Sequence, residues 1–179
     1  MIFQFKVTLK HVGMPVWRRL LIESDTTFEE LHQILLIAFD WEDAHLHDFV
    51  VKKTNGEKPL FEVRIGQKDE VDEEDDSFWA ASSYYDDMAS HSQSEERLSN
   101  WFVQEKDRVL YTYDFGDDWE HDIVLEKILE KEPLIDYPIC VKAKNNTPPE
   151  DSRYELMSGE IDLTNPDGKG IVSSINMYL

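Results

Sequence analysis

The sequence predicts an α+β fold: a mostly antiparallel sheet of hairpins, with one main N-terminal helix packed on one face. Three observations support this prediction. Segments in which apolar and polar residues alternate outnumber segments with helical spacing. Most of these segments follow one another through short turns, which favours hairpins. With 179 residues, 41% of them hydrophobic and 12% aromatic, the chain is long and apolar enough to fill one core.

The N-terminal part is expected to form a hairpin followed by the helix. Residues 2–10 and 16–22 alternate as strands, and the short link between them, with a glycine and a proline, favours antiparallel pairing. Residues 27–39 place apolar side chains at helical spacing. Thr27 and Glu30 have the spacing of a capping box, so the helix is predicted to begin at this point.

A second hairpin and a long acidic segment are expected next. Residues 46–53 and 60–65 are predicted strands, joined through Asn55-Gly56, which is a strong hairpin signal. Between about residues 67 and 93 the periodicity breaks down and acidic residues dominate, so we expect a mobile excursion. A calcium loop is not favoured there, because the run lacks the central glycine and the spaced terminal glutamate of an EF-hand.

The second half of the chain is expected to contain one more hairpin. A short helix is predicted at 95–102, and two strands at 109–115 and 119–129 flank an acidic turn. Prolines make the following stretch extended and irregular. Residues 171–179 are predicted to form a final strand.

The charge balance limits the classes of function. The chain has 38 Asp and Glu against 18 Lys and Arg, a net charge of -20. Such a surface repels phosphates, so we expect no direct nucleic-acid binding; it fits a bound cation, a basic protein partner or solubility. No apolar run reaches membrane-spanning length and no signal peptide is evident, so no membrane association is expected. A single cysteine, Cys140, favours a cytoplasmic location. The oligomeric state stays open.

Two histidine-containing motifs are candidates for a metal site. In the first, His45 and His47 would share one face of a strand, because side chains repeat every second residue. Two imidazoles on one face can bind one ion. The alternative is that one histidine is buried and hydrogen-bonded while the other is exposed.

The second motif surrounds the acidic turn. On the strand after it, His121 shares a face with Trp119, and Glu120 lies on the other face. If the two hairpins meet, His45, His47 and His121 would bind a divalent transition metal with carboxylates nearby. The alternative is that the aspartates only satisfy the turn's own backbone. The carboxylate candidates for this polar site are Asp114, Asp117, Asp118, Glu120, Glu150 and Asp151.

Arg18 completes the candidate polar site. Arg18 and Arg19 are adjacent on a predicted strand, so their side chains point to opposite faces. We expect one of them, with Arg18 as the candidate, to turn inward and pair with a carboxylate of the acidic turn. Such a buried ion pair would explain the turn structurally, with no catalysis needed.

The order of these motifs resembles the plasmid pRiA4b ORF-3-like family. The matching segments are residues 2–10, 15–19, 31–32, 41, 45–49, 111–121, 137–140 and 148–151. We expect residues 1–151 to form the family domain, and residues 152–179 to be a weakly patterned C-terminal segment of it. After Asp151 the sequence departs from the family pattern, because the usual glycine-rich stretch is missing. The resemblance implies an α+β fold, no established activity and an association with mobile elements.

Three functional hypotheses remain open. The first is an acidic interaction or regulatory module that binds a basic protein. The second is a metal-dependent hydrolase with a histidine and carboxylate site. The third is a DNA-mimic inhibitor. The resolvase label that some members of the resembled family carry is not supported, because a recombinase needs an activated serine, arginines at the phosphodiester and a basic DNA-contacting surface.

Overall fold

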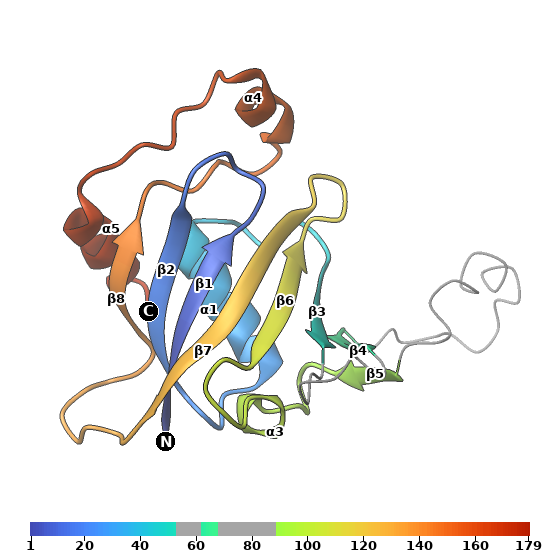
Figure 1. Ribbon diagram of the computed structural model, residues 1–179, viewed down its shortest axis with the longest axis vertical. Coiled ribbons are helices and arrows are strands. Elements are labelled where there is room, and N and C mark those ends of the chain that lie inside the picture. Colours follow the sequence, from blue (N-terminus) through green and yellow to red (C-terminus); the bar gives the residue numbers. More distant parts are fainter. Residues whose placement is uncertain (53–61, 68–88) are drawn as a thin grey trace, which may run out of the picture.

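The computed structural model describes residues 1–52, 62–67 and 89–179. Within them, eight strands form one sheet in the order β5-β4-β3-β6-β7-β1-β2-β8 (Figure 1). Neighbouring strands are antiparallel, except that β4 and β5 are parallel. The predicted α+β fold with a mostly antiparallel sheet is therefore confirmed. The strands are β1 (Ile2–Leu9), β2 (Val16–Glu23), β3 (His47–Lys52), β4 (Glu62–Gly66), β5 (Ala89–Ser92), β6 (Arg108–Tyr113), β7 (Trp119–Leu129) and β8 (Ile139–Lys144).

Helix α1 (Phe28–Phe39) covers one face of the sheet (Figure 1). The predicted capping box is present: the Thr27 hydroxyl accepts from the Glu30 backbone N–H, and the Glu30 carboxylate accepts from the Thr27 backbone N–H. The helix ends at Asp40, whose backbone is left-handed with φ 58°. Besides the short α3 (Leu98–Trp101), the structure has two helices that the sequence did not predict: α4 (Arg153–Ser158) and α5 (Gly168–Ile175).

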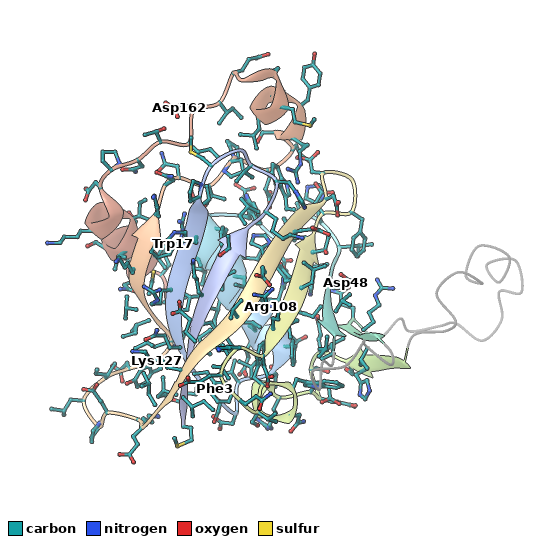
Figure 2. The ribbon with its side chains drawn as sticks, in the orientation of Figure 1. Phe3, Trp17, Asp48, Arg108, Lys127 and Asp162 are labelled. Atoms are coloured by element: carbon teal, nitrogen blue, oxygen red, sulfur yellow. The ribbon has the colours of Figure 1, made fainter. Side chains whose placement is uncertain are left out.

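The core lies between the sheet and α1. Alternate residues of β1 and β2 are buried, and so are the apolar residues on one side of α1. The rings of Phe28 on α1 and Phe49 on β3 meet edge to face, with centroids 5.0 Å apart. Trp17 and Arg108 lie on the opposite face of the sheet, which α1 does not cover (Figure 2). No helix among the described residues is long and apolar enough to cross a membrane.

Three expectations for local structure were wrong. Residues 139–144, inside the stretch expected to be irregular, form β8 at the sheet edge. Residues 168–175 form α5, although a strand was predicted over 171–179. Residues 89–92, expected to belong to the acidic excursion, form β5. The predicted turn at Asn55-Gly56 and the acidic run of residues 69–76 lie outside the described residues.

The start of β3, the end of β6 and the start of β7 lie side by side at one end of the sheet. His47 of β3 pairs with Tyr113 of β6, which in turn pairs with Trp119 of β7. The segment that connects α1 to β3 and the turn that connects β6 to β7 therefore reach the same end. Four of the ten candidate residues are in these two connections: His45, Asp114, Asp117 and Asp118.

Candidate metal centre

The candidate site forms where three connecting segments meet: residues 40–46, residues 114–118 and residues 145–153. The indole N–H of Trp41 donates to the carbonyl of Pro148 over 3.0 Å, and this ties the first segment to the third. The backbone N–H of Asp114 donates to the carbonyl of Leu46 over 2.9 Å, which ties the first segment to the second. Because all of these bonds join distant parts of the chain, the site depends on the whole fold.

Among the described residues, two groups of three side chains each bring ligand atoms within 4.8 Å of one another. His45, Asp114 and Asp151 form the first group, which we call the His45 cluster. His32, Asp43 and His47 form the second, which we call the His32 cluster. His121 belongs to neither group, so the three histidines that the sequence suggested as one ligand set are divided over three positions.

In the His45 cluster, one imidazole nitrogen faces two carboxylates. His45 Nε2 is 3.2 Å from Asp151 Oδ1 and 3.7 Å from Asp114 Oδ2. It is enclosed, yet it makes no well-aligned hydrogen bond with the described residues. The Asp114 side chain is 9% exposed and its Oδ1 accepts from the Gly116 backbone N–H, whereas the Asp151 side chain is 75% exposed. The cluster is therefore fixed on the Asp114 side and open to solvent on the Asp151 side.

Glu150 lies beside the His45 cluster and is held by two donors. The Tyr113 hydroxyl donates to Glu150 Oε1 over 2.5 Å, and the Glu42 backbone N–H donates to the same oxygen over 2.9 Å. The Ala44 backbone N–H donates to the Tyr113 hydroxyl. Burial and the bond to Glu150 raise the pKa of Tyr113, so it stays a neutral donor at physiological pH.

Asp117 and Asp118 of the acidic turn bind Arg153, mainly through their backbone carbonyls, and the sequence did not single out this arginine. The backbone N–H of Arg153 donates to Asp117 Oδ2, and its guanidinium donates to the carbonyls of Asp117 and Asp118. The same guanidinium lies 3.9 Å above the ring centre of Trp119. Arg153 thus fixes the turn and covers the indole, as a structural clamp.

Arg18 does not pair with the acidic turn as predicted. It is 2% exposed, and its guanidinium donates to Thr147 Oγ1 and to backbone carbonyls of β2, α1 and the end of β8, including those of Ala38 and Asn145. Burial lowers the pKa of Arg18 to about 10, which still leaves it charged at neutral pH. Backbone dipoles, rather than a carboxylate, compensate this buried cation.

Glu120 and His121 lie on opposite faces of β7, as the alternation predicts. Glu120 pairs with Lys10 over 2.6 Å and with His11 over 3.1 Å, away from both clusters. His121 is fully buried among Phe39, Trp41 and Tyr111. Neither of its ring nitrogens makes a hydrogen bond to a described residue. Burial lowers its pKa to about 3, so the ring is neutral.

In the His32 cluster, two buried imidazoles stack. The rings of His32 and His47 are 3.4 Å apart with planes 8° from parallel, and His32 Nε2 is 2.8 Å from Asp43 Oδ1. Sequence reasoning missed His32 because it lies within the apolar face of a helix. The one local signal was an ionisable residue at a helix position that is otherwise apolar, four residues after Phe28.

The fold and the site define a class: an α+β protein in which a histidine and carboxylate site lies at one end of an antiparallel sheet. The family model for plasmid pRiA4b ORF-3-like proteins matches residues 1–157, so the chain belongs to this family. The chain is 28% identical over 152 residues to the uncharacterized protein y4hQ of Sinorhizobium fredii. The matched region covers 84% of this chain and 66% of y4hQ, so the chain spans just under two thirds of that relative's length. It also resembles the crystal structure of MM3350 from Methanosarcina mazei Go1, a protein of unknown function, with a TM-score of 0.69 and 29% identity. That likeness covers 98% of this chain and 87% of MM3350.

Proposed function

We propose that this protein binds a divalent metal ion through His45 Nε2, Asp114 Oδ2 and Asp151 Oδ1. The single observation that carries the proposal is an enclosed imidazole nitrogen without a well-aligned hydrogen bond, 3.2 and 3.7 Å from two carboxylate oxygens. One nitrogen and two oxygen donors suit zinc, manganese or iron.

The surroundings of the His45 cluster favour hydrolytic chemistry. Since three protein ligands converge among the described residues and Asp151 is exposed, a metal bound there would have coordination positions open for water and substrate, as in catalytic metal sites. A metal bound there would supply a Lewis acid that lowers the pKa of a bound water. Glu150, oriented by the Tyr113 hydroxyl, is the nearby carboxylate suited to accept a proton from that water. These features support the proposal that the chain is a metal-dependent hydrolase.

Metal titration of the purified protein tests this proposal. After removal of metal with a chelator, isothermal titration with Mn²⁺ is expected to show a site that is lost in both His45→Ala and Asp114→Asn. Asp122→Asn is the matched control and should leave binding unchanged. Asp122 lies on the face of β7 opposite His121, 3.8 Å from Arg108. Unaltered Mn²⁺ binding in both cluster variants would contradict the assignment.

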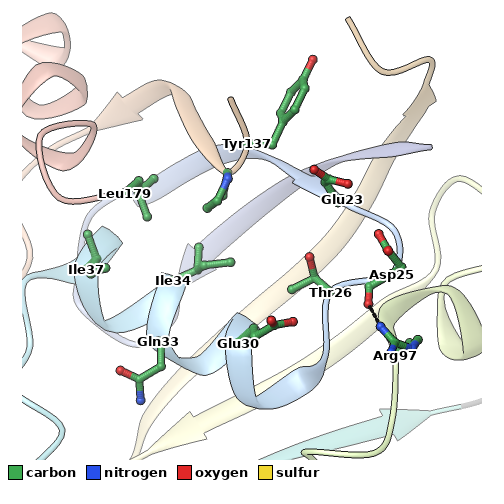
Figure 3. A pocket seen from close by; sticks show the side chains of 11 residues that line it. Glu23, Asp25, Thr26, Glu30, Gln33, Ile34, Ile37, Arg97, Tyr137 and Leu179 are labelled. Carbon is green, nitrogen blue, oxygen red and sulfur yellow. Dashed lines mark hydrogen bonds between the residues drawn. The ribbon is translucent and has the colours of Figure 1, made fainter. Parts of the chain in front are cut away.

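A second candidate function is an acidic interaction or regulatory module, as in the first sequence hypothesis. The supporting observation is a cavity of about 490 Å³ whose lining combines carboxylates with an apolar floor (Figure 3). Glu23, Asp25 and Glu30 lie around it, while Ile34 and Ile37 of α1 line its base (Figure 3). A basic segment with an aliphatic anchor fits such a lining. A regulatory role would agree with the association with mobile elements that the family resemblance suggested.

This second function is tested with a fluorescent peptide of alternating lysine and leucine. Fluorescence anisotropy is expected to show binding that weakens as salt is raised, because the attraction is between exposed charges. Asp25→Asn should weaken binding further, whereas Asp162→Asn should not, because Asp162 does not line the cavity. Binding that neither salt nor Asp25→Asn changes would exclude the cavity as a charged docking site.

A further inference from the structure

We propose that His32, Asp43 and His47 form a second metal site, one that takes a nitrogen-preferring transition ion such as Zn²⁺. This site shares no ligand with the His45 cluster. His32 comes from α1, Asp43 from the connection after α1, and His47 from the first residue of β3. The ligand atoms of the three side chains lie within 4.8 Å of one another.

The strongest observation is an unpartnered nitrogen of a buried side chain. His47 is 5% exposed, and its Nε2 is 2.7 Å from Gln93 Oε1. Because an amide oxygen only accepts, Nε2 carries the proton and Nδ1 holds the lone pair. That Nδ1 is buried and has no hydrogen-bond partner among the described residues. A buried acceptor without a donor raises the free energy of the folded state, and a bound cation would compensate for the missing donor.

Each of the three candidate ligands is also held from behind by a second side chain. Gln93 fixes His47 through Nε2, and the Tyr111 hydroxyl lies 2.8 Å from His32 Nδ1. The amide of Gln33 donates to Asp43 Oδ2 over 3.2 Å, leaving Oδ1 turned toward His32 Nε2. Outer partners that fix the tautomer and orientation of each ligand are typical of metal sites.

The donor set indicates which ion would bind. Two imidazole nitrogens and one carboxylate favour zinc, copper, nickel or cobalt over magnesium and calcium, which prefer oxygen ligands. His47 Nδ1 offers its lone pair directly, whereas His32 Nε2 donates its proton to Asp43 Oδ1 and must pass that proton to Nδ1, beside the Tyr111 hydroxyl, before it binds an ion.

Ion binding requires one local rearrangement. In a parallel stack with rings 3.4 Å apart, the lone pairs of two imidazoles run side by side, whereas ligands of one ion must converge on it. One ring has to tilt out of the stack while Gln93 or Tyr111 keeps its outer nitrogen in place. This tilt distinguishes a metal site from two histidines that only pack against each other, because packed rings would stay stacked when Zn²⁺ is added.

The test uses His45→Ala protein, in which the His45 cluster has lost its nitrogen ligand. Isothermal titration with Zn²⁺ is expected to show one remaining site, and adding His47→Phe should weaken it on the order of 100-fold. Adding Gln93→Leu should weaken it on the order of 10-fold, because Gln93 only orients His47. His121→Phe is the matched control, since it exchanges a buried histidine outside both clusters and should leave the affinity unchanged.

A second measurement covers the case in which His47→Phe does not fold. In ¹⁵N NMR spectra of the otherwise wild-type His45→Ala protein, Zn²⁺ should move the Nδ1 resonance of His47 and leave those of His121 in place. Zn²⁺ that leaves the His47 resonance unchanged, or binds His47→Phe as tightly as its parent, overturns this proposal. Loss of Mn²⁺ binding in His45→Ala concerns only the His45 cluster, so failures of the two proposals are distinguishable.

Discussion

His121 should make the stability of this protein strongly pH-dependent. Burial lowers its pKa from 6.5 to about 3 in the folded protein, while the unfolded chain keeps the ordinary value. The unfolded state therefore binds one more proton than the folded state between these two values. The corresponding stability is fully present above pH 6.5 and is lost as the pH falls toward 3.

The magnitude follows from the difference between the two pKa values. A change from 6.5 to about 3 is about 3.5 units, and at ~1.4 kcal/mol per unit it corresponds to roughly 5 kcal/mol. Between pH 6 and 5, His121 should contribute a slope of about 1.4 kcal/mol per pH unit to the free energy of unfolding. His32 and His47 add slopes of the same sign, because their pKa values are lowered as well.

Urea denaturation of metal-free protein at several pH values, followed by tryptophan fluorescence, measures this slope. His121→Phe should reduce it by about 1.4 kcal/mol per pH unit. At pH 7.5 the same substitution should change the free energy of unfolding by less than about 1.5 kcal/mol, because the lost imidazole made no hydrogen bond to a described residue. His11→Phe is the control, since it removes an imidazole from an exposed position. If His121→Phe keeps the wild-type slope, the reasoning from burial is refuted.

Three other substitutions test the structural role of named contacts. Arg18→Met should lower the free energy of unfolding in urea by about 3 kcal/mol or more, because it leaves several buried carbonyls without their donor. Thr27→Ala should cost about 1 kcal/mol in the same assay, since it removes half of the α1 capping box. Arg153→Ala should shift tryptophan emission to the red, because the guanidinium that covers the Trp119 ring is lost. Unchanged emission from Arg153→Ala would mean that other groups shield this indole.

Structure that depends on local periodicity could be predicted from the sequence. Strand β7 matches its predicted bounds, and its alternation correctly assigned Trp119 and His121 to one face, which the fold buries. The start of α1 follows from Thr27 and Glu30, whose side chains need only each other's backbone. Helix α5 was missed because Gly168 and Gly170 looked like turn residues. Gly168 instead opens the helix after Asp167, whose side chain accepts from the Gly170 backbone N–H.

Contacts between distant segments could not be predicted in the same way. Arg18 was expected to point inward, and it does. Its partners, however, are backbone carbonyls up to 127 residues away in the sequence rather than a carboxylate. The stack of His32 on His47 requires α1 to pack against the start of β3, which no local pattern specifies. Only a buried ionisable residue on the apolar face of the helix hinted that His32 would need a polar partner.

His45 and His47 lie in different clusters because only His47 belongs to strand β3. A two-residue repeat places His45 and His47 on one face only if both belong to the strand, but β3 begins at His47. His45 lies in the preceding connection, where the left-handed backbone of Asp43 redirects the chain.

The Tyr113 ring lies beside both clusters, 5.7 Å from the His45 ring and 6.2 Å from the His32 ring. Because one five-residue segment supplies ligands to both clusters, an ion in one cluster must alter the geometry available to the other. The two metal affinities should therefore be coupled, and His45→Ala and His47→Phe should be non-additive when combined.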